Sequence, residues 1–309
     1  MSEITLNERV AAEGIAAAGG IVWPRITVVT AVYNGAGYLE ETIRSVIGQG
    51  YPNLEYIVVD GESTDGTVEI IKKYEKDLAW WVSKKDKNVY EALQTGFSRA
   101  TGEVMGWLNS SDKLHTHGLF VVGSVFAQFP QVEWITGRPT SFSESGMPVL
   151  IQALPRWSRY RFLAGANKYI QQESTYWRRG LWERAGGAMS TEDRAAGDFE
   201  LWVRFFRYTQ IYAVDALIAG YRFHADAMSF AGREKYDQAC EEIVERELNT
   251  IARGKAIRRF RGMGRVIRSL PKGRGLWQHV VLKSLYKLGG ADLPPMIEDR
   301  QNKWVMRAR

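Results

Sequence analysis

The feature that most constrains this fold is a regular alternation of short apolar runs with amphipathic stretches between residues 26 and 108. The runs ITVVTAV and LEYIVVD are rich in β-branched residues, as is typical of strands buried on both faces. The stretches between the runs place apolar side chains at helical spacing. This β-α-β alternation predicts an α/β fold with a mostly parallel sheet sandwiched by helices. The expected strands cover residues 26–32, 54–60, 78–82 and 104–108, and the expected helices cover residues 38–49, 67–74 and 89–99.

Polar residues follow several of the expected strands where they end. Tyr33 and Asn34 follow the first strand, Asp60 and Gly61 end the second, and the run from Asn109 to Asp112 follows the fourth. In open parallel sheets, ligands bind beyond the carboxyl ends of the strands. A second ligand-binding candidate is the segment 137–165, which is predicted to be a long, loop-rich excursion with scattered Gly, Pro and Ser.

Several chemistries lack their signature. Gly35 and Gly37 follow a strand, but Glu40 occupies the third glycine position of a dinucleotide-binding loop. One cysteine and four histidines give no zinc signature. A nucleotidyltransferase on a related sheet is an alternative. It would need a basic phosphate loop after the first strand, and AVYNGAGYLE contains no Lys or Arg.

Several motifs in consecutive order resemble the inverting family 2 glycosyltransferases. They are TVVTAVYNGAGYLEETIRSVIGQGYPNLEYIVVDGESTDGT, WVSKKDKNVYEALQTGFSRATGEVMGWLNSSD, QQESTYWRRGLWERAGG, GDFELWVRF and YRFHADAMS. The similarity covers roughly residues 24–230. It implies a GT-A fold, a nucleotide-sugar donor and a divalent metal ion, Mn²⁺ or Mg²⁺.

The resemblance also implies which residues hold the donor. Asp60 matches an aspartate that recognises uracil, which predicts a uridine diphosphate sugar. The alternative is that Asp60 and Gly61 only make the turn. Asp65 is expected to cap the helix that follows it. The predicted donor-binding residues are Thr30, Val32, Tyr33, Asn34, Asp60, Gly61, Ser63, Asp86, Asn109 and Ser111.

Asp112 and His224 are the predicted metal ligands. A hard cation with oxygen ligands can neutralise the charge that develops on a diphosphate leaving group. Family members often carry paired acids at the end of the fourth strand, and the final Asp112 matches the position that usually contacts the metal. Ser111 replaces the other acid of the pair. The alternatives are a helix-capping role for Asp112 and a structural role for His224.

Asp198, in GDFELWVRF, is the predicted catalytic base. In an inverting transfer the acceptor hydroxyl attacks the anomeric carbon, and a carboxylate within hydrogen-bond reach can take its proton. The alternative is a helix N-cap. Trp202 is expected to pack in the core rather than to stack on sugar. Gln171, Gln172 and Arg178 fall in an acceptor-side motif.

The charge of the chain is divided unevenly. Residues 253–309 carry 15 Lys and Arg against 3 Asp and Glu, whereas the whole chain has a net charge of +6. We therefore expect an N-terminal extension (1–23), a GT-A domain (24–230) and a helical, basic C-terminal extension (231–309). Amphipathic basic stretches at 253–270 and 276–288 favour attachment to an anionic membrane surface. Packing on the catalytic domain is the alternative, and a nucleic-acid partner is not expected.

The remaining expectations concern place and activity. The N-terminus carries acidic residues and no unbroken apolar core, which does not indicate a signal peptide. A cytoplasmic protein, peripheral at the inner face of the cell membrane, is expected. The acceptor is expected to be a glycan or lipid-linked sugar of bacterial surface polysaccharide. A catalytically silent sugar-nucleotide-binding domain is the alternative outside enzymes.

Overall fold

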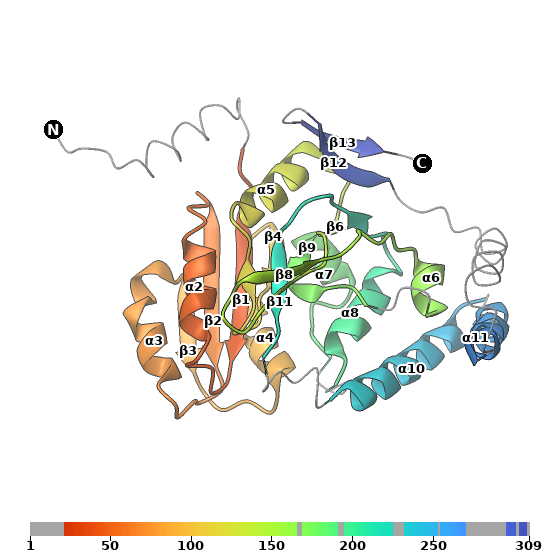
Figure 1. The fold of residues 1–309 in the computed structure, drawn as a ribbon, viewed down its shortest axis with the longest axis horizontal. Helices are drawn as coiled ribbons and strands as arrows, with labels where there is room; N and C mark the ends of the chain where they lie inside the picture. The colour runs from red at the N-terminus through yellow and green to blue at the C-terminus, as the bar shows by residue number, and fades with distance from the viewer. Residues whose placement is uncertain are drawn as a thin grey trace.

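A computed structural model describes residues 22–165, 169–190, 195–224, 232–252, 254–269, 295–300 and 303–307. Its first half alternates strands and helices, as the apolar runs predict (Figure 1). The strands of this half are β1 (Ile26–Val32), β2 (Leu54–Asp60), β3 (Trp80–Ser83) and β4 (Val104–Trp107). The helices are α2 (Leu39–Ile47), α3 (Thr67–Lys73), the short 3₁₀ turn η1 (Glu75–Asp77) and α4 (Val89–Phe97).

These four strands run parallel to one another in a seven-stranded sheet with the order β10-β6-β9-β4-β1-β2-β3. The other three strands are β6 (Trp134–Thr136), β9 (Thr175–Arg178) and β10 (Tyr212–Ala213). β9 runs antiparallel to both of its neighbours, β4 and β6. The sheet is therefore mostly parallel, and the carboxyl ends of β1, β2, β3 and β4 meet at one edge.

Each face of the sheet carries its own hydrophobic core. Val29 and Ala31 of β1 point into a core shared with α4 and α8 (Gly197–Phe205). Ile26 and Val28 point into a second core shared with α2, α3 and α5 (Gly118–Gln128). This alternation explains why β1 is apolar along its whole length.

The segment predicted to be loop-rich, 137–165, contains regular structure instead. It includes β7 (Thr140–Phe142), β8 (Pro148–Ile151) and α6 (Arg159–Leu163). β7 and β8 join β5 (Lys113–Leu114) and β11 (Ala219–Arg222) in a second sheet with the order β5-β11-β7-β8. The strands of this sheet are short and come from distant parts of the sequence, so local patterning did not predict them.

The C-terminal part returns to the body of the protein. It contains α10 (Arg233–Thr250), α11 (Gly254–Ser269), β12 (Met296–Arg300) and β13 (Lys303–Arg307), and it follows α7 (Arg179–Arg184) and α8 along the chain. β12 and β13 form a hairpin above α5 (Figure 1), where Trp304 Nε1 donates to Ser124 Oγ over 2.7 Å. A wholly helical extension was expected, so the hairpin is a correction. The predicted amphipathic stretch 276–288 lies outside the described residues.

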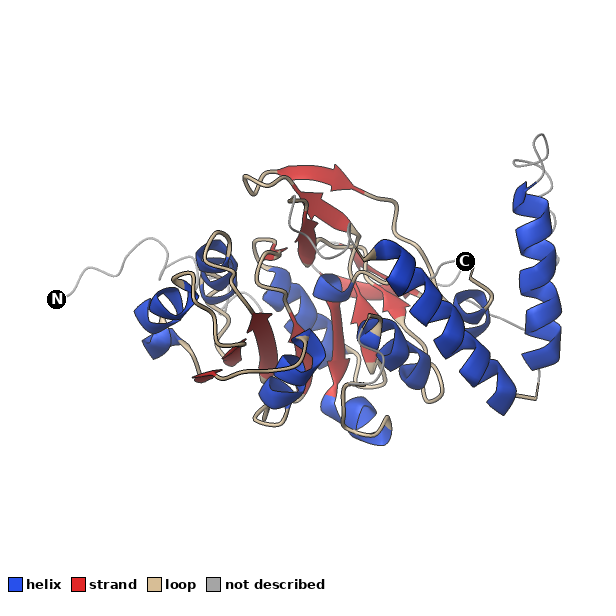
Figure 2. Ribbon diagram, turned by 90° about the horizontal axis from the view of Figure 1, so that it is seen from below, coloured by secondary structure: helices blue, strands red, loops and turns tan. Residues whose placement is uncertain are grey.

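Helix α10 packs against α8, and α11 stands at the rim of the molecule (Figure 2). Cys240, Ile243, Val244 and Leu248 of α10 are buried in the same core as α4 and α8. No helix among the described residues is both long and apolar enough to cross a membrane.

Candidate active site at the carboxyl edge of the sheet

The loops that follow β1 and β2 are joined by hydrogen bonds at the carboxyl edge. The backbone N–H of Asn34 donates to Ser63 Oγ over 2.7 Å, and Asn34 Oδ1 accepts from Thr64 N over 2.9 Å. Asp65 accepts from Ala36 N over 3.0 Å and from Thr67 N, the first residue of α3, over 3.1 Å. Asp65 therefore organises the start of the helix, as expected of a capping residue, and also ties the two loops together.

The Asp60 carboxylate is fully buried and accepts hydrogen bonds from the turn that follows it. Oδ2 accepts from the backbone N–H groups of Glu62 and Ser63, both over 3.1 Å, and from Ser83 Oγ over 2.6 Å. Oδ1 accepts from Ser63 Oγ over 2.5 Å. A nucleobase would have to share the carboxylate with these donors. The geometry is that of the turn-forming alternative for Asp60.

Asp86 lies beside the same turn and has a different environment. A methyl group placed on Gly61 would lie 2.7 Å from Asp86 Oδ2 and 3.4 Å from the ring of Tyr33. Asp86 accepts no hydrogen bond from the described residues. Burial raises the pKa of its carboxyl group, and the nearby charges of Glu91 and Asp60 raise it further. Tyr33 is 67% exposed, so an exposed aromatic ring and a half-buried carboxylate both lie beside Gly61.

Two other predicted donor contacts lie inside the sheet. The side chain of Thr30 is fully buried, and its hydroxyl lies 3.0 Å from the hydroxyl of Tyr56. The side chain of Val32 is also buried, and its carbonyl accepts from Gly61 N over 2.8 Å. These side chains support the edge from within rather than line it.

Asp112 lies in the loop that follows β4, and its side chain is fully buried. Its Oδ1 accepts from the backbone N–H of Arg222 over 3.0 Å, and its Oδ2 accepts from Asn109 Nδ2 over 3.1 Å. Burial raises the pKa of Asp112 to about 7, although the hydrogen bond from Arg222 opposes the rise. Asn109 and Ser111, in the same loop, are only half-buried, so they are more exposed than the carboxylate.

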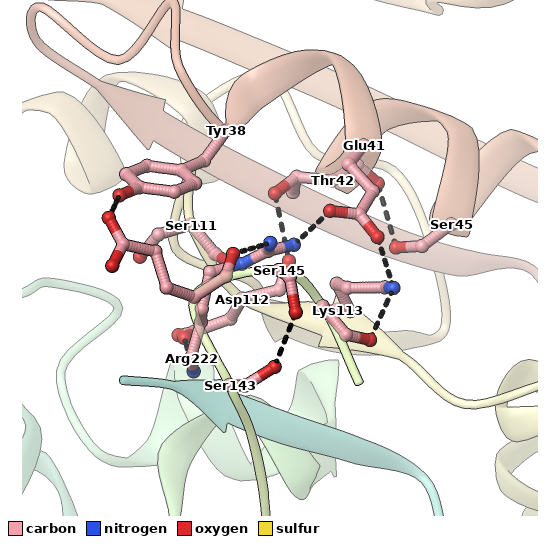
Figure 3. Close-up of polar contacts among 12 residues, drawn as sticks. Tyr38, Glu41, Thr42, Ser45, Ser111, Asp112, Lys113, Ser143, Ser145 and Arg222 are labelled. Atoms are coloured by element: carbon pink, nitrogen blue, oxygen red, sulfur yellow. Dashed lines mark hydrogen bonds and ion pairs between the residues drawn. The ribbon is translucent and has the colours of Figure 1, made fainter. Parts of the chain in front are cut away.

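Arg222 connects this loop to α2 and to the turn between β7 and β8 (Figure 3). Its guanidinium donates to the carbonyl oxygens of Ser111 and Glu144 over 2.6 and 2.8 Å, and to Glu41 over 2.5 Å. The guanidinium also lies 5.3 Å from the ring centroid of Tyr38. These contacts fix the loop that contains Asn109, Ser111 and Asp112.

His224 follows β11, and its ring lies 4.6 Å from that of Tyr38. Its Nδ1 is buried and has no hydrogen-bond partner among the described residues. Within the described ranges, no group of three or more His, Cys, Asp or Glu side chains is placed to hold a metal ion. The Asp112 carboxylate is fully buried and belongs to no such group, so these residues as they lie do not fit a metal site built on Asp112.

Asp198 lies in the first turn of α8, and two tyrosine hydroxyls donate to it. Tyr90 donates to Oδ1 over 3.4 Å, and Tyr236 donates to Oδ2 over 3.2 Å. Burial raises the pKa of Asp198, whereas hydrogen bonds from the Phe199 N–H and from both tyrosines lower it. Tyr90 is in the first turn of α4, which follows the carboxyl end of β3, so Asp198 lies at the predicted edge.

Glu173 lies between the Asp112 and Asp198 groups and was not predicted. Burial raises its pKa well above the ordinary value, and the charges of Asp112 and Asp198 add to the rise. Gln171 and Gln172, which were assigned to the acceptor side, both donate to it. Glu173 could have been found in the sequence as the one charged residue of the QQES motif.

Arg178 and Trp202 have structural positions. Arg178 pairs with Val104 at the start of β4, so it lies at the opposite edge from the site, and its guanidinium donates to the carbonyls of Val132 and Phe126. The acceptor-side assignment of Arg178 is therefore wrong. Trp202 is 1% exposed and stacks on Trp107 with a centroid distance of 5.6 Å, which confirms its packing role.

Comparisons with known sequences show similarity to glycosyltransferases. Residues 27–120 match the family described as Glycosyl transferase family 2. TuaG of Bacillus subtilis strain 168, named as a glycosyltransferase of teichuronic acid biosynthesis, is 33% identical over 132 residues, 42% of this chain and 49% of TuaG. The glycosyltransferase Rv1514c of Mycobacterium tuberculosis H37Rv is 34% identical over 91 residues, 29% of this chain and 35% of Rv1514c. The chain thus spans about half or less of the length of these relatives.

Solved structures share the fold. S. aureus TarS 1-349 in complex with UDP-GlcNAc has a TM-score of 0.61 at 16% identity, over 76% of this chain and 70% of that chain. The mannosyltransferase PcManGT from Pyrobaculum calidifontis, in complex with GDP-Man and Mn2+, has a TM-score of 0.53 at 20% identity, over 86% of this chain and 70% of that chain. The chain has the α/β architecture of these GT-A enzymes.

Proposed function

We propose that this chain transfers a sugar from a nucleotide-diphosphate donor to an acceptor hydroxyl with inversion, and that Asp198 is the general base. The observation that carries the proposal is the Asp198 carboxylate, which lies at the ligand-binding edge and accepts from two tyrosine hydroxyls. The acceptor oxygen attacks the anomeric carbon and gives its proton to Asp198. The bond between that carbon and the diphosphate oxygen breaks, and the nucleoside diphosphate leaves with the electron pair.

The donor in this proposal is a uridine diphosphate sugar. Asp86 takes the place first assigned to Asp60, because its carboxylate has no donor among the described residues and can accept from the imide N–H of uracil. Tyr33 supplies an exposed ring beside it. The UDP-GlcNAc bound by TarS supports this donor class. Asn34, Ser63, Asn109 and Ser111 border the same edge.

Dependence on Mn²⁺ or Mg²⁺ stays a prediction of the family resemblance. PcManGT, which shares the fold, was solved in complex with Mn2+, and this supports the prediction. We assign no step of the transfer to a metal, because the buried Asp112 carboxylate and His224 do not fit one as they lie.

The acceptor in the proposal is a glycan or lipid-linked sugar of a surface polysaccharide, in keeping with the name of TuaG. The basic segment 253–309 would hold the enzyme at an anionic membrane surface through its Lys and Arg side chains. The proposed transfer takes place at the carboxyl edge of the sheet and does not depend on attachment to a membrane.

The test of the proposed function is Asp198→Asn, with Asp77→Asn as the matched control. Asparagine keeps the size and much of the capping ability of aspartate but lacks the basic carboxylate. We expect calorimetric affinity for uridine diphosphate to stay near normal, and sugar transfer or donor hydrolysis to fall about a hundred- to ten-thousandfold. Asp77 is exposed on η1, which precedes the amino end of β3 and so lies at the edge opposite the site; its variant should act like the wild type.

Activity of Asp198→Asn within a few fold of wild type would rule out Asp198 as the base. Nucleotide binding by the unmutated protein, without release of uridine diphosphate from any of a panel of nucleotide sugars, would favour the catalytically silent alternative.

A further inference from the structure

Helix α10 reaches the candidate active site, although the sequence places residues 231–309 in an extension outside the predicted GT-A domain. The hydroxyl of Tyr236, in the first turn of α10, donates to Asp198 Oδ2 over 3.2 Å. Tyr90 of α4 donates to the other carboxylate oxygen over 3.4 Å. The two tyrosines come from opposite parts of the chain and bracket one carboxylate.

The position of Tyr236 is fixed by the packing of α10. Cys240, Val244 and Leu248, at roughly one-turn intervals after Tyr236, are buried in the core. One turn from the end of the helix, the buried Glu247 carboxylate forms ion pairs with Arg159 and with Arg207, each over 2.6 Å. α10 is therefore held against α6 and α8 along its length.

A second aromatic ring supports Tyr236 from the other side. Tyr169 stacks on it with a centroid distance of 6.3 Å and an interplanar angle of 21°. The Tyr169 hydroxyl donates to Asp237, the neighbour of Tyr236, over 2.9 Å. Tyr169 thus restrains the first turn of α10 next to the carboxylate.

Tyr90 is fixed in a comparable way. The side chain of Asn88 caps α4 and accepts from the backbone N–H of Tyr90 over 3.0 Å. The Tyr90 ring is 8% exposed and belongs to the core beneath the sheet. A methyl group on Gly197 would lie 2.9 Å from this ring, so the glycine before Asp198 lets α8 approach Tyr90.

We propose that Tyr236 is a positioning residue that orients the Asp198 carboxylate, so that the C-terminal helix completes the active site. This inference rests on the proposed function in one respect, which is that Asp198 is the general base. The hydrogen bond at Oδ2 restricts rotation of the carboxylate and leaves the remaining lone pairs to receive the acceptor proton.

The ionisable groups around Asp198 influence the pKa of its carboxyl group. They are Tyr90 from α4, Tyr236 from α10, Glu173 from the turn before β9, and Cys240 behind Tyr236. Burial raises the pKa of Asp198, and the tyrosine hydroxyls lower it because they donate to the ionised form. Loss of the Tyr236 hydroxyl should therefore raise the pKa of Asp198 further.

The test measures the Asp198 carboxylate directly in the full chain. Protein labelled with ¹³Cγ-aspartate is titrated by NMR, and the Asp198 resonance is identified by its loss in Asp198→Asn. In Tyr236→Phe we expect its titration midpoint to move up by about one pH unit, the size expected for a lost hydrogen bond to a charged group. Tyr208→Phe, a change of the same kind at a residue that is 51% exposed, should leave the midpoint unchanged.

Tyr90→Phe provides the second variant and should raise the midpoint in the same direction. Midpoints in Tyr236→Phe that match wild type to within about 0.2 unit would overturn the positioning role. The proposed function is tested separately by the activity of Asp198→Asn. An inactive Asp198→Asn with an unshifted Tyr236→Phe would keep the general base and reject Tyr236.

Discussion

Asp60 and Asp86, both predicted to bind the donor, have different environments. The Asp60 carboxylate is buried and accepts from four donors, whereas Asp86 accepts from none of the described residues and lies against Gly61. A carboxylate that recognises a base must have a free oxygen that faces the ligand. Asp86, which has no donor among the described residues, suits this requirement better than Asp60, whose carboxylate is already bound by its own turn.

Replacing Asp86 with alanine should weaken the binding of uridine diphosphate about tenfold, because one hydrogen bond to a charged acceptor is lost. Binding of cytidine diphosphate, whose base has no imide N–H, should change little. Calorimetric titration of both nucleotides measures the ratio of the two affinities. Glu69→Ala, a change on the first turn of α3, is the control. An unchanged ratio in Asp86→Ala would remove Asp86 from base recognition.

The sequence predicts which residue types gather at the site better than it predicts which way each side chain points. Asp198 could be predicted because its motif and its helix start are local in sequence. The burial of Asp112 could not, since the N–H that binds it belongs to Arg222, 110 positions further along the chain. Tyr236 was missed for the same reason, because its contact with Asp198 depends on the packing of α10.

At the scale of the elements, Arg222 holds three segments together. It links β11 to the loop after β4, to the turn between β7 and β8, and to α2 through Glu41 (Figure 3). Lys113 adds a second link, since its ammonium pairs with Glu41 and donates to the Gly146 carbonyl. Strands and helices up to residue 107 follow from local periodicity, whereas the second sheet depends on these distant polar contacts.

Replacing Arg222 with alanine should lower the free energy of unfolding by about 2–4 kcal/mol, because buried carbonyl groups lose their donors. The Arg222 side chain is 2% exposed. Arg138→Ala is the matched control: Arg138 pairs with Asp215, but its side chain is 32% exposed, so the loss should stay below about 1 kcal/mol. Urea unfolding of both variants measures the difference. Equal losses in the two variants would contradict a stabilising role for the buried cluster.

For the whole molecule, the charge division of the sequence and the packing of the structure have different boundaries. The excess of positive charge begins near residue 253. The core continues through α10, and the hairpin of β12 and β13 covers α5, with Ile297 fully buried. Ile257 and Arg261 of α11 are also buried, and Arg261 donates to the Leu163 carbonyl. Part of the basic segment therefore packs on the domain, and its attachment to a membrane stays a prediction.

Glu247 gives the sharpest test of how α10 is joined to the catalytic body. Its carboxylate is 1% exposed and pairs with Arg159 of α6 and Arg207 beyond α8. Glu247→Ala removes both pairs and should lower the free energy of unfolding by about 1–3 kcal/mol, since the two partly exposed arginines can regain water. Glu245→Ala, two residues earlier on the same helix, removes the Arg258 pair of a side chain that is 46% exposed and should cost less than about 1 kcal/mol. Urea unfolding followed by circular dichroism measures both losses.

Because α10 carries Tyr236, Glu247→Ala should also reduce sugar transfer, whereas Glu245→Ala should not. Equal stability and equal transfer in the two variants would mean that α10 is an independent appendage.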